Sequence, residues 1–422
     1  MAVLILCMMV GFSVPPLFNS FRVGDNMDYN LWQRTGLKVL EGAQIYPTDG
    51  SSFPFMYPPP CATLLAPISP LPEFLFVLVL VLFNSVAWAA CILLSVQLAT
   101  GSWRGAHPAL YLWPSVAVVP LVHNTYLLGQ PAIVLLALVL GCFALLRRGN
   151  PFAGGVLLAL ATVIKAYPVI AAGYLIYRRQ WRALAGLACG LVVAFAVLPL
   201  PFRAPAQVQE DVVVWARGML FKNEEKGIAQ RPQRSLGYKN QSLQATVHRM
   251  LRPVLANGES DKSWRVNIAN LTFAQANIAM LAAVALLVAI YVGATFGIPV
   301  IRPSGQSLEM GMAVVLAVLL APLSFQYSYV WLLFPITTLL YLFLAAPHKS
   351  NLRRAAIVTI GGCVFLLLWS IPATRTAAAY GNIFFSGVVL YIGSAVILRC
   401  GWLCELTSQE GRGDSAASVT RG

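Results

Sequence analysis

The sequence predicts an all-α polytopic membrane protein, a bundle of about twelve transmembrane helices with loops on the outer face. Hydrophobic residues make up 58% of the 422-residue chain and charged residues only 10%, whereas soluble domains are about a quarter charged. The apolar runs are long and continuous rather than alternating, which favours helices over a closed barrel. Most of the surface is therefore expected to face lipid.

The apolar runs predict the spans in order along the chain. We expect them near 2–20, 73–99, 108–126, 129–146, 151–165, 167–177, 182–201, 270–297, 308–323, 328–346, 353–371 and 381–399. The runs 151–165 and 167–177 are short for full crossings and meet at Pro168. The proline-rich segment 59–70 is too short to cross, so we expect it to be re-entrant or interfacial.

Basic residues in the short loops predict the orientation, because loops rich in Lys and Arg stay in the cytoplasm. One set of loops holds Arg104, Arg147, Arg148, Arg178, Arg179, Arg182, Arg302, Lys349, Arg353, Arg354 and Arg399. The opposite set holds Lys165 and Arg375. Both termini are then expected in the cytoplasm. The net charge of +14 is interpreted as this topology signal, so nucleic acid is not an expected partner.

We expect residues 1–422 to form one domain with two long polar segments outside. The first outer loop is 21–60 and continues as the re-entrant segment to 70, and the large outer loop is 202–269. The tail 400–422 is predicted to be cytoplasmic and disordered. Because nearly all the residues outside the membrane are predicted to lie on the outer side, the pattern favours a function at the outer face.

Asp28 is a conspicuous carboxylate, since the chain has 15 Asp and Glu against 29 Lys and Arg. It follows the first apolar run and sits at a membrane boundary, where a general base is one interpretation. An N-cap for a helix over 29–41, ended by Gly42, is the other. Asp25 is interpreted as a solvated neighbour.

Lys165 ends an apolar run among uncharged neighbours. It is either a lysine that reaches the membrane interface along its apolar stem or an ammonium that binds a phosphate, since ionisable groups at membrane depth are functional candidates.

Two polar stretches of the later chain are further candidates for function. Asn240, Gln241 and Ser242 suit sugar hydroxyls, or form a helix cap at Ser242. The large outer loop has further cations, which form either a solvated outer surface or one that attracts anionic lipid headgroups: Lys222, Lys226, Arg231 and Arg234. The polar-aromatic loop 324–329 alone would be an aromatic interface belt.

Several short motifs follow one another along the chain. They are Asp28-Tyr29, Gly42 with Tyr46-Pro47, Tyr57-Pro58-Pro59, Gly129-Gln130, Ala153-Gly154-Gly155 through Ile164-Lys165-Ala166-Tyr167-Pro168, Arg178-Arg179-Gln180-Trp181-Arg182, Asn240-Gln241-Ser242-Leu243 with Arg249, and Ala321-Pro322-Leu323-Ser324-Phe325. In this order they resemble glycosyltransferase family 87, the bacterial polyprenyl-phosphate-mannose-dependent α-mannosyltransferases, which have the GT-C membrane fold. The resemblance runs from about Asp25 to Tyr380-Gly381.

The resemblance implies an inverting transfer of a sugar, mannose at the family level, from a polyprenyl phosphate to a hydroxyl of a glycolipid or glycan. The reaction would occur at the outer face of the plasma membrane, and the lipid donor is a co-substrate rather than a cofactor. Asp28 would be the general base. Lys165, Arg249 and Tyr327 would contact the donor phosphate. The residues implied to bind substrate are Tyr57, Gln130, Asn240, Gln241 and Ser242.

The chain departs from the family pattern at two positions. The family often has Asn two residues after the Gly-Gln pair, where this chain has Ala132. Its late loop often has a histidine where this chain has Tyr327, which can donate a hydrogen bond but has no positive charge.

No metal is expected, because no carboxylate cluster or cysteine spacing indicates one. The eight cysteines are interpreted as small apolar side chains.

A transporter or flippase is the alternative function, since many spans and broken helices occur in such proteins. A family member that has lost activity is a third. The transporter predicts internal repeats and charges at the membrane midplane, whereas here the polar residues gather at one face, which favours an enzyme.

Overall fold

The computed structural model describes a chain that is almost entirely helical. The described residues are 2–21, 26–102, 104–231, 234–257, 264–298, 303–348, 350–369 and 375–419, with side chains as far as 401. Asp25, predicted to be solvated, and Arg302 and Lys349, predicted to lie in cytoplasmic loops, are outside these residues.

One short antiparallel hairpin, β1 (Asn223–Glu224) with β2 (Gly227–Ile228), accompanies the helices. The helices are α1 (Ala2–Asn19), α2 (Met27–Leu40), α3 (Pro59–Leu65), α4 (Glu73–Thr100), α5 (Ala109–Ala117), α6 (Val119–Leu128), α7 (Ala132–Arg147), α8 (Pro151–Ile164), α9 (Ala172–Tyr177), α10 (Trp181–Val192), α11 (Pro205–Met219), α12 (Leu243–Leu251), α13 (Phe273–Thr295), α14 (Pro303–Leu320), α15 (Leu333–Ala345), α16 (Asn351–Leu368), α17 (Arg375–Ala379) and α18 (Asn382–Val419). Short helical turns cover Ala66–Ile68, Tyr167–Ala171, Val193–Val197, Arg234–Leu236 and Gln326–Leu332.

Among the described residues, six helices are long and apolar enough to cross a membrane. They are α4, α13, α14, the Gln326–Ala345 helix, α16 and the Asn382–Gly401 part of α18. A seventh is α6 with α7 if the pair counts as one span, although it bends by 116° at the break. The chain is thus an all-α multi-pass membrane protein. The twelve expected spans are not confirmed, because several apolar runs are divided into short helices at Pro and Gly.

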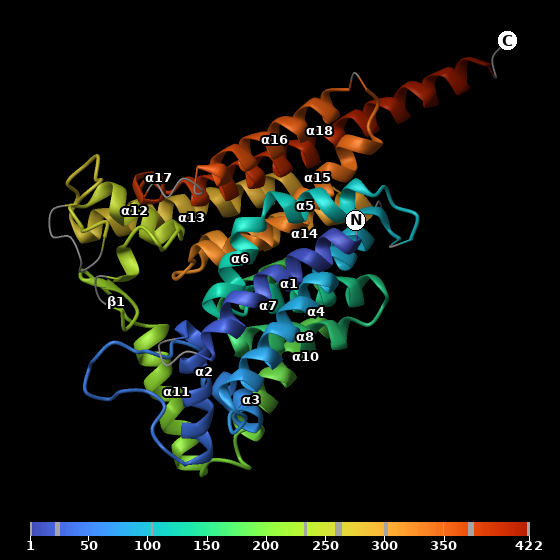
Figure 1. Cartoon of the computed structure of the whole chain (residues 1–422). Helices are drawn as coiled ribbons and strands as arrows, with labels where there is room; N and C mark the ends of the chain where they lie inside the picture. Colours follow the sequence, from blue (N-terminus) through green and yellow to red (C-terminus); the bar gives the residue numbers. More distant parts are fainter. Residues whose placement is uncertain are drawn as a thin grey trace.

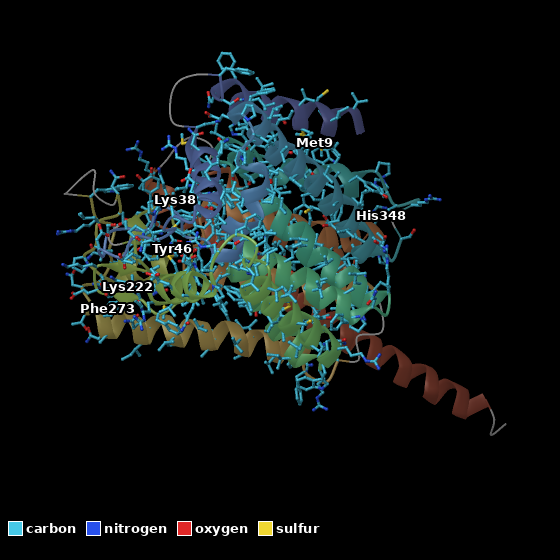
Figure 2. All side chains as sticks on the ribbon, turned by 90° about the horizontal axis from the view of Figure 1, so that it is seen from below. Met9, Lys38, Tyr46, Lys222, Phe273 and His348 are labelled. Carbon is cyan, nitrogen blue, oxygen red and sulfur yellow. The ribbon has the colours of Figure 1, made fainter. Side chains whose placement is uncertain are left out.

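The molecule has two distinct ends. The described parts of 26–72 and 202–272 contain α2, α3, α11, α12 and the hairpin, and they gather at one end, which we call the loop end (Figure 1). Figure 2 shows Lys38, Tyr46, Lys222 and Phe273 toward this end and His348 toward the other. The expected re-entrant segment is α3 and its following turn, a short helix packed against α2 and α8 at the loop end.

Helices α8 and α10 pack backbone to backbone. A Cβ added to Gly155 would lie 1.9 Å from the carbonyl oxygen of Ala183, and one on Gly186 would lie 2.1 Å from that of Phe152. Small residues allow this close approach between membrane helices. The contact fixes α8, whose last turn leads directly into Lys165.

The tail expected to be disordered continues α18 as far as Val419. A helix that is already formed needs no new nucleus, so weakly helical residues can extend it.

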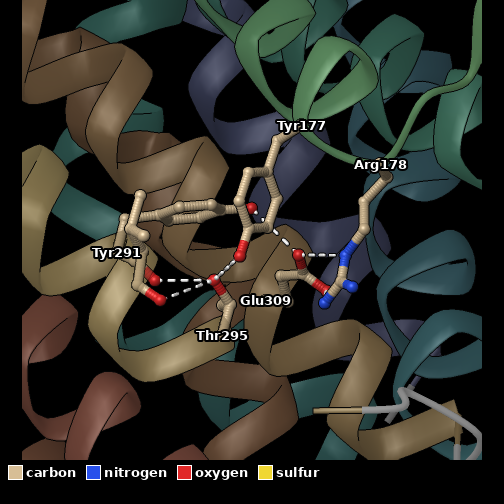
Figure 3. A network of polar contacts seen from close by, with 6 residues as sticks. Tyr177, Arg178, Tyr291, Thr295 and Glu309 are labelled. Carbon is tan, nitrogen blue, oxygen red and sulfur yellow. Dashed lines mark hydrogen bonds and ion pairs between the residues drawn. The ribbon is translucent and has the colours of Figure 1, made fainter. Parts of the chain in front are cut away.

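An ion pair joins Arg178, which follows α9, to Glu309 of α14 (Figure 3). The Nε and Nη2 atoms of Arg178 donate to the carboxylate of Glu309 at 2.6 and 2.7 Å. The hydroxyl of Tyr291 donates to the same carboxylate at 3.2 Å, and Thr295 donates to Tyr177 beside it. Glu309 is 1% exposed and Arg178 is 26% exposed.

Arg178→Met is expected to destabilise the protein by about 3 kcal/mol, because it leaves the buried carboxylate of Glu309 without its cation. The double variant Arg178→Met with Glu309→Leu should recover most of this loss, since no buried charge remains. Thermal unfolding in detergent measures both. Equal losses of stability in the single and the double variant would show that the unpaired carboxylate of Glu309 is not the cause.

Candidate functional site

Asp28 lies in the first turn of α2, at the loop end. The helix starts at Met27 and its N-cap is Asn26, so Asp28 is inside the helix rather than at the capping position. The helix-cap interpretation is therefore wrong. A carboxylate in a first turn is favoured by the helix dipole. As predicted, the helix ends before Gly42, whose φ of +66° suits glycine.

Gln130 meets Asp28 from the break between α6 and α7. Its Nε2 donates to Oδ2 of Asp28, and its Oε1 accepts the hydroxyl of Tyr57 at 3.0 Å. Gly129 makes the turn with φ of +69°, and a Cβ there would lie 2.9 Å from the ring of Tyr29. The sharp break thus aims Gln130 at the start of α2.

Lys165 lies at a second break, where extended backbone separates α8 from the turn that follows. Its Nζ lies 5.5, 5.8 and 4.8 Å from the ring centroids of Tyr57, Tyr167 and Tyr327. It also donates to the hydroxyl of Tyr327 at 3.4 Å. Ring faces attract a cation, each by about 0.5–2 kcal/mol. We call these three rings the tyrosine cage.

Charges of both signs act at this place. Asp28 is close enough to Lys165 for the two charges to interact. Arg231 is close enough to Tyr327 for its charge to act on the phenol. Arg231 was predicted to be a surface cation, and nothing in its local sequence pattern distinguishes it from the other cations of the loop. Burial, and then the charge of Asp28, raise the pKa of Tyr57 well above its ordinary value, so its hydroxyl keeps its proton.

A cavity of about 90 Å³ adjoins the tyrosine cage. Its polar lining is Lys165 with Tyr57 and Tyr167. Its other walls are Met56, Ala166, Trp215, Met219, Leu220, Ala321, Pro322, Leu323 and Phe325. The cavity therefore combines one ammonium with a mainly apolar surface.

Asn240, Gln241 and Ser242, predicted to bind substrate, instead hydrogen-bond to the protein itself. The Asn240 amide donates to the carbonyls of Ser235 and Pro322 and accepts two backbone N–H groups, which is its full capacity. The Gln241 amide donates to two backbone carbonyls, and its Oε1 accepts a hydrogen bond from a backbone N–H. Ser242 caps α12, as the alternative interpretation had it. A substrate-binding role does not fit these buried contacts.

Arg249, predicted to contact the donor phosphate, is also fully buried and bound to backbone. Its Nε donates to the carbonyl of Ala379, and its Nη1 donates to the carbonyls of Leu236, Gly237 and Asn240 at 3.0 to 3.1 Å. Burial lowers its pKa to about 9, which leaves it charged at neutral pH. These contacts give Arg249 a structural role, since it holds separate backbone segments of the loop end together.

Five predicted residues therefore come together and four do not. Asp28, Tyr57, Gln130, Lys165 and Tyr327 form one cluster, which we call the site cluster. It combines a carboxylate, a caged cation and an apolar cavity in a multi-pass membrane protein. Among the described residues, no group of three or more His, Cys, Asp or Glu side chains could hold a metal ion.

The carboxylate of Asp28 lies within interaction range of the caged ammonium of Lys165, which lines an apolar cavity in a multi-pass membrane protein. The model of glycosyltransferase family 87 matches residues 55–325, more than half of the chain, and the protein belongs to this family. It is therefore a membrane glycosyltransferase. No curated protein matches the chain. Asp28 and Tyr327 lie outside the matched residues, so their roles depend on the geometry above.

Proposed function

We propose that the protein transfers a sugar, mannose by family expectation, from a polyprenyl phosphate to a hydroxyl of a glycolipid or glycan. The observation that carries the proposal is the carboxylate of Asp28 within interaction range of the caged Lys165, which lines the apolar cavity. A phosphate that carries a long apolar chain needs a cation next to an apolar surface, and the cavity has both.

The proposed reaction is a single displacement with inversion. The acceptor oxygen forms a bond to the anomeric carbon while the bond from that carbon to the phosphate oxygen breaks. Asp28 takes the acceptor proton. Lys165 stabilises the charge that develops on the departing polyprenyl phosphate, and Tyr327 adds a hydrogen bond but no charge. A monophosphate leaving group has less charge to offset than a diphosphate, so we expect neither a metal nor a cofactor.

We further propose that the site faces the outside of the plasma membrane. Helix α8 runs from the basic Arg147–Arg148 turn to Lys165, so the two lie a helix length of about 21 Å apart. Because short basic loops stay in the cytoplasm, this separation supports an outward-facing site that meets membrane lipids and the glycolipid or glycan acceptor.

The direct test uses membranes that contain the protein, a polyprenyl phosphate labelled in its mannose, and a glycolipid fraction as acceptor. We expect label to appear in the acceptor only when protein and lipid donor are both present. A nucleotide sugar in place of the lipid donor is the control and should give no product. Sealed vesicles measure the transporter alternative. Solute flux without sugar transfer, or transfer from the nucleotide sugar, would overturn the proposal.

A further inference from the structure

We propose that Gln130 and Tyr57 are positioning residues that hold the carboxylate of Asp28, rather than substrate ligands. The three side chains form one hydrogen-bonded series. The hydroxyl of Tyr57 donates to Oε1 of Gln130 at 3.0 Å, and Nε2 of Gln130 donates to Oδ2 of Asp28. This inference depends on the proposed function, because it assigns a task to the base.

The direction of the series follows from the chemistry of its ends. An ionised carboxylate can only accept hydrogen bonds, so the amide must present its N–H₂ group to Asp28. The amide oxygen then faces Tyr57, whose hydroxyl keeps its proton and can donate. The opposite amide orientation would place two acceptors against each other. Tyr57 therefore selects the orientation in which Gln130 can hold Asp28.

Two features outside the series hold Asp28 and Gln130 next to each other. Gln130 is 2% exposed and lies at the 116° break between α6 and α7. Tyr29, the residue after Asp28, donates its hydroxyl to the carbonyl of Tyr126 near the end of α6 at 2.7 Å. This bond ties the start of α2 to the helix that delivers Gln130. The helix break and the Tyr29 side chain together thus set the relative position of Asp28 and the Gln130 amide.

Tyr57 also links the base to the cation. Its ring packs on Trp32 at a centroid distance of 4.4 Å and contributes a face to the cage around Lys165. Its hydroxyl acts on Asp28 through Gln130, whereas its ring acts on Lys165. Tyr57→Phe removes the first contribution and keeps the second, so the two can be separated by experiment.

The function of the series is to set the plane of the carboxylate and to keep it ionised. One oxygen is held by a buried amide, which limits how the carboxylate can turn toward an acceptor hydroxyl. A hydrogen bond to a carboxylate favours its charged form. Loss of the amide should therefore misalign the base and move the acid limb of the pH profile to higher pH.

The test compares Gln130→Met, Tyr57→Phe and the double variant in the sugar-transfer assay. Gln130→Met should lower kcat about tenfold to a hundredfold, the order expected for a misplaced group, with the donor KM within about twofold. Its acid limb should shift upward. Tyr57→Phe should act in the same direction and more weakly. The double variant should be no slower than Gln130→Met, because Tyr57 acts through Gln130.

Gln33→Met is the matched control. Gln33 is a glutamine of α2 whose amide donates to the carbonyls of Ser69 and Leu71, at 3.1 and 2.7 Å. Its loss removes two hydrogen bonds from the same helix, so it should change stability while the pH profile of kcat stays as in the wild type.

Two outcomes overturn the inference. Additive losses in kcat, or losses confined to KM, would make Gln130 and Tyr57 independent substrate ligands. Wild-type rates and pH profiles in both single variants would remove any role for the series. Tyr57→Phe keeps its ring packed, so it remains informative if Gln130→Met folds poorly. If the wild-type protein transfers no sugar from the lipid donor, the proposed function fails instead, which is a distinct result.

Discussion

Asp28→Asn is expected to lower kcat for sugar transfer by a factor of about 10² to 10⁴, the usual contribution of a general base. The substitution preserves the shape of the side chain and its contact with Gln130 but removes the group that accepts the proton. Because the carboxylate is not proposed to bind the phosphate, the donor KM should change by no more than about twofold. Steady-state kinetics with labelled polyprenyl phosphate mannose separate the two quantities.

Asp49→Asn is the control for this prediction. Asp49 is an exposed carboxylate of the same outer loop, and its carboxylate accepts the backbone N–H of Ser51. Its variant should transfer sugar at the wild-type rate. Asp28→Asn at the wild-type rate would show that the base is another group, or that the reaction needs none.

Lys165→Met is expected to lower kcat/KM by a factor of about 10² to 10³, which is typical for loss of one group that stabilises developing charge. Methionine keeps most of the apolar stem between the rings of the cage but has no cation for the phosphate. Unlike Asp28→Asn, this variant should also bind the donor more weakly. The two variants together would therefore show that Asp28 takes the proton and that Lys165 binds the phosphate.

Lys222→Met is the control for the loss of a cation from the loop end. Lys222 lies 3.5 Å from Glu224 in a partly exposed pair that is worth little. Its variant should stay within about twofold of the wild type. A similar loss in both lysine variants would mean that general positive charge attracts the donor, and that the caged ammonium has no special part.

The end of α2 and the break at Lys165 could be predicted from the sequence, because glycine and proline mark them directly. Gly42 ends α2, and Pro168 lies in the turn that follows Lys165. The number of spans could not be predicted as well. Hydropathy detects apolar runs, but it does not show whether a run is one helix or two short ones that meet at an angle, as α6 and α7 do.

The site cluster was predicted in part, and the errors have one physical cause. Asn240 was chosen because its amide suits sugar hydroxyls, and Arg249 because the family resemblance implies a contact with the donor phosphate. Whether a polar group faces a ligand depends on which backbone carbonyls lie near it, and those belong to segments far away in sequence, such as Pro322 and Ala379. Glu309 did carry a signal, because it is a carboxylate at the start of the apolar run 308–323.

The hydrogen bonds between Asn240 and the Pro322–Ser324 segment bear on how the enzyme is made. Asp28 and Tyr57 leave the ribosome early, whereas Tyr327 belongs to the last third of the chain. The tyrosine cage is complete only after that late segment has been inserted and fastened to the earlier loop. A nascent chain that is truncated or stalled before Tyr327 therefore lacks a complete cage around Lys165. Sugar transfer is therefore expected only from chains whose synthesis has passed Tyr327.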